Sequence, residues 1–448
     1  MEKPNVPAEG QGSIHRQILS LAIPALGALV AEPIFTLADS AMVGHLGTPE
    51  LAGLALASTV LLTVVGLCIF LAYTTTAVTA RRVGAGDVAG GLRHGIDGLW
   101  LAVILGFALA VGLAGTASPV VVALGADAHT APHAVAYLQY SAPGLPGMLL
   151  VLAATGVLRG MLDTRTPLYV ATAGAVVNVG LNALFIYGMG MGVGGSGLGT
   201  AVTQTLMGAY LTVTVWHHAR RLHVRPALNL RGLWISFVTG LPLLVRTATL
   251  RLAILATVSV VAGLGPVALA GHQIVNAVWA LTADVLDALA IAAQALVGQG
   301  LGAGKEAQVR RILRTCLRWG VGAGVVIGVV LVALSWWVPH FFTPDAPVRS
   351  AATAGLVVIG VLMPLAGWVF VLDGVLIGAG DGRYLAFAGL LTLVVYLPAL
   401  GLVSAFAPAG MWGLVWLWVS FAGVFMLARA LTTAWRARGS AWMRLGAS

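Results

Sequence analysis

The chain has 448 residues, of which 59% are hydrophobic and only 9% are charged, and its mean hydropathy is +0.96. Soluble domains carry about 25% charged residues, so this composition excludes a soluble globular protein and indicates a polytopic membrane protein. The formal net charge of +9 is explained by basic residues at the cytoplasmic ends of helices, and we expect no nucleic-acid partner.

Apolar runs separated by glycine, proline and charged residues predict twelve membrane-spanning helices, since each needs about 20 mostly apolar residues. In the first half of the chain they are 15–43, 51–80, 92–115, 132–158, 166–188 and 196–218. In the second half they are 233–262, 269–298, 308–337, 350–379, 384–405 and 411–435. The expected fold class is an all-α polytopic membrane protein.

The basic residues predict the topology. All but three of the 24 Lys and Arg residues fall in one alternating set of loops and helix ends, which includes Arg429. Arg349 lies on the opposite side, and Arg246 and Arg251 lie inside a predicted helix. By the positive-inside rule, both termini are cytoplasmic. We expect a multi-pass protein of a plasma membrane, namely a bacterial inner membrane.

Residues 24–165 repeat at low identity as residues 242–383, with a constant offset of 218. Pro24 pairs with Pro242, and Gly156 and Gly160 pair with Gly374 and Gly378. An internal repeat in so apolar a chain is typical of secondary transporters. We expect an N-terminal lobe (1–216), a cytoplasmic linker (217–231) and a C-terminal lobe (232–448). Six helices per copy predict a pseudo-two-fold axis along the membrane normal.

Ionisable residues inside the predicted helices are functional candidates, because each costs about 2.5–3.5 kcal/mol at mid-helix on the insertion scale. Seven were identified: Glu32, Asp39, Arg246, Arg251, Asp284, Asp287 and Asp373. None has a charged residue at the equivalent position of the other copy. The two copies therefore share a scaffold and differ in chemistry.

In the first copy, Asp39, Asn182 and Thr200 are predicted to lie at one depth and to meet, and Asn178 is predicted to share a helical face with Asn182. No basic residue lies in the membrane part of this lobe, so Asp39 could take a proton from outside and release it inside. The same oxygens could instead coordinate Na⁺. Asp39 as a helix cap and the two Asn side chains as interhelical hydrogen-bonding groups are the structural alternatives.

Glu32 lies seven residues before Asp39 and therefore on the same face of the first predicted helix. Pro33 permits a bend of that helix that could move Asp39. In the second copy, Arg246, Asp284, Asp287 and Asp373 predict a buried charge network, because a lone buried charge is costly. That network is either structural or a second site that binds substrate or senses the proton.

Neither a metal cluster nor a constellation of catalytic residues occurs in the sequence, so we expect no enzyme, no metal site and no cofactor. The segment from Gly298 to Lys305 looks like a phosphate loop, but Glu306 stands where that motif needs Ser or Thr. We expect a monomer in the lipid bilayer whose partners are small organic substrates.

The segment 32–47, EPIFTLADSAMVGHLG, resembles the first helix of multidrug and toxic compound extrusion (MATE) exporters, especially the DinF-type branch. Segments 268–274, 286–298 and 372–381 agree with the same family. The resemblance implies two six-helix lobes and export of amphipathic, often cationic compounds, with Asp39 as the coupling carboxylate. Some members carry an acidic residue where Asn182 stands here. Its absence leaves fewer negatively charged oxygens in the first lobe, which favours H⁺ over Na⁺. A Na⁺-coupled exporter and a lipid-linked precursor flippase of the same superfamily are the alternatives.

Overall fold

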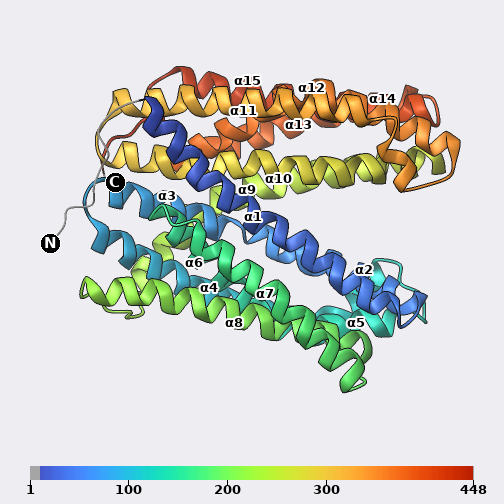
Figure 1. Ribbon diagram of the computed structural model, residues 1–448, viewed down its shortest axis with the longest axis horizontal. Helices are drawn as coiled ribbons and strands as arrows, with labels where there is room; N and C mark the ends of the chain where they lie inside the picture. Colours follow the sequence, from blue (N-terminus) through green and yellow to red (C-terminus); the bar gives the residue numbers. More distant parts are fainter. Residues whose placement is uncertain (1–10, 447–448) are drawn as a thin grey trace. The chain divides into compact units, whose positions relative to one another are not determined.

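The computed structural model describes residues 11–446 and is all-helical over that range (Figure 1). All twelve predicted spans are helical. In the first copy the elements are α1 (Gln11–Gly44), α2 (Thr48–Leu67), α3 (Phe70–Gly84), α4 (Val88–Ala123), α5 (Ala131–Ser141), η1 (Ala142–Gly144), α6 (Leu145–Gly160), α7 (Arg165–Ala183), η2 (Leu184–Gly188) and α8 (Gly192–Arg221). In the second copy they are α9 (Leu230–Gly263), α10 (Pro266–Gly302), α11 (Glu306–Leu334), η3 (Val338–Phe341), α12 (Ala346–Gly378), α13 (Gly382–Phe406), α14 (Met411–Trp418), η4 (Val419–Phe425) and α15 (Met426–Arg438).

Several predicted spans are single runs that change helix type along their length. The second span is interrupted between α2 and α3, and η1 is a 3₁₀ turn between α5 and α6. The π-helical segments η2 and η4 interrupt the fifth and twelfth spans. Insertions of this kind occur often at functional sites, and η2 begins two residues after Asn182.

Eleven of the helical runs in the described residues are long and apolar enough to cross a membrane. The remaining predicted span is α8, which has 30 residues but contains many glycines and threonines and ends in His218, Arg220 and Arg221. Its small residues pack closely against neighbours. A methyl group at Gly197 would lie 2.6 Å from the carbonyl oxygen of Tyr137. The composition that lowers the hydropathy of α8 is thus the composition that its packing requires.

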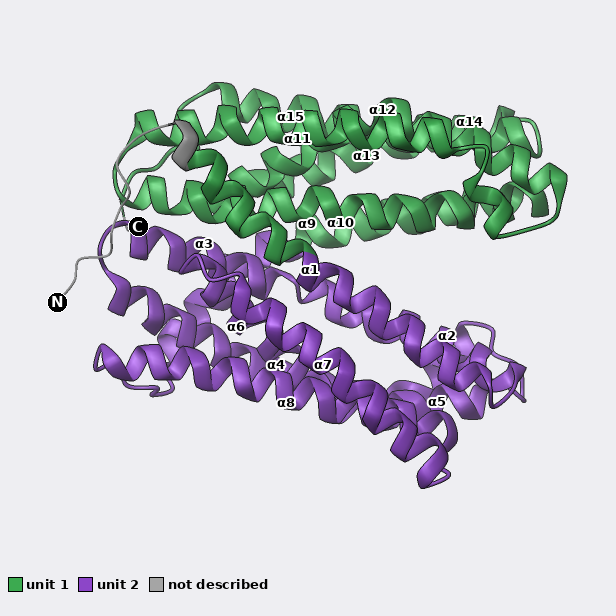
Figure 2. Cartoon of the chain, viewed as in Figure 1, with its two compact units in different colours: residues 1–26, 245–446, 448 green, residues 27–244, 447 purple. Residues whose placement is uncertain are grey.

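The chain forms two compact units (Figure 2). One unit is Gly27–Leu244. The other consists of the described residues up to Leu26 together with Val245–Gly446. The divisions fall inside α1 and α9, so each of these helices contributes residues to both units. The predicted lobes, in contrast, were divided at the linker 217–231, and that assignment remains a prediction.

Glycine contacts repeat in the two copies. In one unit, a methyl group at Gly156 of α6 would lie 2.5 Å from the carbonyl oxygen of Ala72 on α3. In the other unit, a methyl group at Gly374 of α12 would overlap the carbonyl oxygen of Ala290 on α10. Both members of the second pair are displaced by 218 from the first. The repeat therefore preserves close helix–helix approach through small residues.

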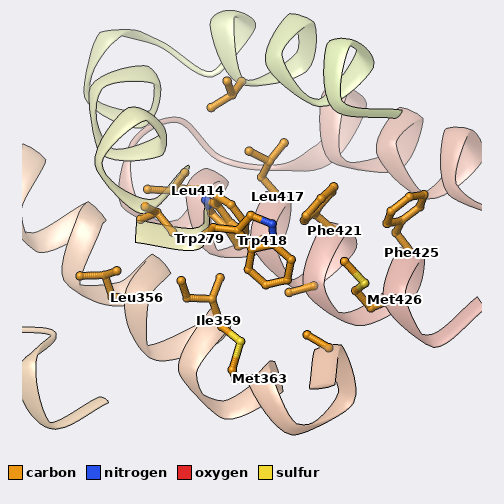
Figure 3. Packing of buried hydrophobic residues seen from close by; sticks show 14 of the residues in the cluster. Trp279, Leu356, Ile359, Met363, Leu414, Leu417, Trp418, Phe421, Phe425 and Met426 are labelled. Carbon is orange, nitrogen blue, oxygen red and sulfur yellow. The ribbon is translucent and has the colours of Figure 1, made fainter. Parts of the chain in front are cut away.

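The hydrophobic core of the second copy is rich in aromatic rings. Trp279 on α10 packs against Trp418 and Phe421, and Phe421 stacks on Phe425 with ring centroids 5.3 Å apart. Figure 3 shows these rings beside Leu356, Ile359 and Met363 of α12. The corresponding cluster of the first copy contains mainly aliphatic side chains and alanine. The two copies thus fill the same scaffold differently.

Candidate functional site

A buried polar cluster in the unit Gly27–Leu244 surrounds Asp39 of α1, whose side chain is only 3% exposed. The amide of Asn182 donates one hydrogen bond to Oδ1 of Asp39 and another, of 3.1 Å, to Oδ1 of Asn178. The hydroxyl of Thr200 donates to Oδ2 of Asp39 at 3.4 Å. The structure therefore brings together Asp39, Asn182 and Thr200, which the sequence placed at one depth, and Asn178, which shares a helical face with Asn182.

Local sequence explains how the helices deliver these groups. Asn178 and Asn182 are four residues apart, which places both on one face of α7. Gly199 precedes Thr200 on α8, and a methyl group at Gly199 would overlap Oδ1 of Asn182. Glycine at this position lets α8 approach the amide, so that Thr200 and Asn182 can reach the same carboxylate.

Two further polar residues belong to the cluster and were not predicted. Ser196 on α8 lies beside Asp39, and Tyr137 on α5 lies near Thr200 and Asp39. Both are buried. Both side chains are neutral at physiological pH, so neither stands out in an apolar segment as a buried charge does.

No ion pair found in residues 11–446 includes Asp39. The buried Nδ2 of Asn178 and Oδ1 of Asn182 make no hydrogen bond within the same described range. The cluster thus offers a carboxylate that no cation neutralises, together with amide groups whose hydrogen-bonding capacity is not fully used. Such a site can bind a proton, or a small cation through its oxygens.

Glu32 and Pro33 lie in the same helix as Asp39 but in a different environment. Both are exposed, whereas Asp39 is buried. The chain remains helical through Pro33, because α1 runs without interruption from Gln11 to Gly44. The structure thus places both residues outside the polar cluster.

The other unit contains a buried charge cluster centred on Asp373 of α12. Nη2 of Arg246 on α9 lies 2.7 Å from Oδ2 of Asp373, and Nη2 of Arg429 on α15 contacts the same oxygen. All three side chains are buried. The guanidinium of Arg429 also lies over the rings of Phe370 and Phe425, at 5.9 and 5.7 Å.

This cluster differs from the predicted charge network. The prediction counted Arg429 among the basic residues of loops and helix ends and named no buried partner for it, whereas the structure buries it against Asp373 within α15. Of the four residues predicted to form the network, the structure joins Arg246 and Asp373. Asp284 and Asp287 are half-buried on α10, and Arg251 is exposed on α9.

The position equivalent to Asp39 in the second copy has lost the carboxylate. It is Thr257, whose hydroxyl lies 2.6 Å from that of Tyr396 on α13. Tyr396 also packs against the ring of Phe425 in the aromatic core of the second copy. A carboxylate site of the Asp39 type therefore occurs in the first copy, and a pair of hydroxyl groups occupies the equivalent position in the second.

Asp97 on α4 is a buried carboxylate that the sequence analysis did not select, although it lies in a predicted helix. A methyl group at Gly232 would overlap its carboxylate, so α9 begins directly against it. Arg82 and Arg93 are near enough to interact with it electrostatically. Its contact with the start of α9 indicates a structural anchor for the segment between the copies.

The sequence profile of the family described as MatE matches residues 24–184 and 232–400. The chain belongs to the MatE family. It is therefore a multi-pass membrane transporter of the multidrug and toxic compound efflux class, and it is not an enzyme.

Similar proteins span nearly the whole chain. "Protein DETOXIFICATION 44, chloroplastic" of Arabidopsis thaliana is 30% identical, over 96% of this chain and 83% of its own length. "DNA damage-inducible protein F" of Escherichia coli strain K12 is 26% identical, over 87% of each chain. The crystal structure of the Vibrio cholerae MATE transporter VcmN in the bent form superposes with a TM-score of 0.85 at 20% identity, over 95% of this chain and 98% of that one. At that identity the superposition shows a shared fold.

Proposed function

We propose that this MatE-family chain is an H⁺-coupled antiporter that exports amphipathic or cationic organic compounds, with Asp39 as the proton carrier. The observation that carries the proposal is the buried carboxylate of Asp39, which hydrogen-bonds to Asn182 and Thr200. No ion pair within residues 11–446 includes it.

The cluster favours two charge states with different hydrogen bonding. The ionised carboxylate accepts from the amide of Asn182 and the hydroxyl of Thr200. A protonated Asp39 would donate one hydrogen bond itself, so one of these donors would have to rotate or find another acceptor. Because α1 carries Asp39 while α7 and α8 carry its hydrogen-bonding partners, a change of partner at Asp39 would alter the contacts of α1 with α7 and α8. Protonation could thereby bias the inward-open and outward-open states of the transporter.

A proton carrier suits export because a proton entering from outside can be released inside after substrate has left. We expect the substrate to be bound largely by shape and apolar contact, as amphipathic compounds are. A neutral amide at Asn182 supports H⁺ over Na⁺, since it leaves Asp39 as the one carboxylate in the cluster. Sodium remains the alternative coupling ion, with Asp39, Thr200 and the amide oxygens as its ligands.

We also infer the setting in which the protein works. The basic residues support cytoplasmic termini and insertion in a bacterial inner membrane. We further propose that the protein belongs to the DinF-type branch and works as a monomer. Reporter fusions that are active only in the cytoplasm, placed at the C-terminus and after Arg349, test the topology. Activity at the C-terminus only is expected, and the reverse pattern would contradict it.

Drug-resistance profiling in an efflux-deficient host tests the function. The wild-type chain should raise the inhibitory concentration of several cationic compounds, and Asp39→Asn should reach the membrane in equal amount but confer no resistance. Asp345→Asn is the matched control, because it removes an exposed carboxylate far along the sequence from the cluster. Measurements at two sodium concentrations separate the coupling ions. Resistance that persists in Asp39→Asn would rule out Asp39 as the carrier, and resistance that depends on sodium would favour Na⁺.

A further inference from the structure

The helix α11 carries three exposed arginines on one face near its cytoplasmic end, namely Arg311, Arg314 and Arg318. At 100° per residue they fall within about 60° of one another around the helix. The buried residues Ile312 and Cys316 lie on the opposite face. The three guanidinium groups therefore form one stripe directed away from the packed core of their unit.

Among the described residues, no carboxylate is paired with this stripe. None of the ion pairs found in residues 11–446 includes Arg311, Arg314 or Arg318. The acid at the start of the helix, Glu306, is paired with Arg310 at 2.9 Å. Three unneutralised cations on one helical face favour an anionic partner.

The same helical face continues into an apolar surface. Val325 and Val329 are 46% and 64% exposed, and they lie at the same angle around α11 as the arginines. Arg318 and Val329 are separated by about 16 Å along the helix, which is close to half the thickness of the hydrocarbon core. The stripe thus passes from cationic to apolar over the length of one membrane leaflet.

An aromatic side chain indicates where the membrane interface lies. Trp319 follows Arg318 and donates a hydrogen bond from Nε1 to Nδ1 of His15 at 2.8 Å, within the same unit. Tryptophan concentrates at the depth of the lipid headgroups. The arginine stripe is therefore at the depth where phosphate groups lie.

The first copy lacks this feature. The positions on α4 equivalent to Arg311, Arg314 and Arg318 are Arg93, Ile96 and Trp100. A general excess of basic residues at cytoplasmic ends would not require three arginines on one face of one copy only. The stripe is a local property of α11.

We propose that α11 binds one anionic phospholipid of the cytoplasmic leaflet, with its phosphate on Arg311, Arg314 and Arg318 and an acyl chain along Val325 and Val329. Guanidinium groups match phosphate oxygens in geometry and charge. The proposal does not depend on the coupling ion or on the exported substrate.

Native mass spectrometry of the full chain in detergent tests the proposal, with phosphatidylglycerol and phosphatidylcholine of identical acyl chains as probes. Each basic residue near an anionic lipid surface strengthens binding about fivefold, so the triple change of Arg311, Arg314 and Arg318 to Gln should weaken the tightest phosphatidylglycerol site by roughly a hundredfold. The triple change to Lys should keep most of the affinity.

The matched control changes three other exposed cytoplasmic arginines, Arg220, Arg221 and Arg225, to Gln. It should leave the tightest phosphatidylglycerol site unchanged. The proposal is overturned if the α11 variant keeps its affinity, if the control loses as much, or if phosphatidylcholine binds equally well. Monodisperse elution and an unchanged thermal midpoint establish that each variant is folded. If the triple Gln variant is not folded, the triple Lys variant is compared with the wild-type chain instead.

Discussion

Replacing Asp373 by Asn should destabilise the protein by removing a buried carboxylate that Arg246 and Arg429 both contact. Both guanidinium groups stay buried after the substitution, and α9, α12 and α15 hold them in place. The neutral amide has nearly the same size as the carboxylate, so packing changes little and the effect is electrostatic.

The size of the effect follows from the burial of the cluster. Breaking a buried ion pair by removing one partner costs about 3–5 kcal/mol, because the remaining charge stays out of water. Asp39→Asn provides the comparison, since it removes a carboxylate that belongs to no ion pair found in residues 11–446. We expect Asp39→Asn to change the free energy of unfolding by less than about 1 kcal/mol.

Equilibrium unfolding in mild detergent, followed by tryptophan fluorescence, measures both variants. A combined variant, Arg246→Met with Asp373→Leu and Arg429→Met, tests the electrostatic origin. It should recover most of the lost stability, because an apolar replacement of a buried ion cluster is often neutral or stabilising. An Asp373→Asn protein as stable as the parent would refute this reasoning, and would point to a functional role if transport were lost.

Three further predictions concern close helix packing, one buried hydrogen bond and the proline in α1. Gly320→Ala should lower the free energy of unfolding by about 1–3 kcal/mol, because its methyl group would lie 2.6 Å from the carbonyl oxygen of Gly367. The control Gly322→Ala should be neutral or stabilising, because its methyl group would meet nothing within 4 Å. Equal stabilities of the two variants would contradict this prediction. Thr257→Val and Tyr396→Phe each remove one partner of a 2.6 Å hydrogen bond. A double-mutant cycle should therefore give a coupling energy of about 1 kcal/mol. A coupling energy near zero would show that the bond adds no stability. Pro33→Ala should reduce transport while leaving thermal stability intact, and normal transport would show that a bend at Pro33 is not needed.

The sequence predicted most of the fold because membrane helices have few ways to satisfy their backbone. Each of the twelve apolar runs is helical, and the glycines shared at the offset of 218 make equivalent close contacts in both copies. The changes of helix type at η2 and η4 were not predicted. They depend on side-chain packing, which composition does not reveal.

The polar cluster was predicted from depth alone, since residues equally far from a membrane surface on adjacent helices can meet. Asp39, Asn182 and Thr200 do so. Arg429 was missed because it lies near the end of its span, where arginine is common and needs no buried partner. Only the path of α15 across α12 reveals that it reaches Asp373. Tyr137 was missed because a tyrosine within an apolar segment carries no charge that would single it out.

The most direct test of the central claim is proton movement in proteoliposomes that contain the purified protein. With a pH gradient imposed and sodium absent, the wild-type chain should move a cationic substrate in the direction opposite to the proton flow. Added substrate should in turn dissipate the pH gradient. Asp39→Asn should bind substrate but do neither. Coupled transport by Asp39→Asn, or wild-type transport driven only by sodium, would contradict the assignment of Asp39 as the proton carrier.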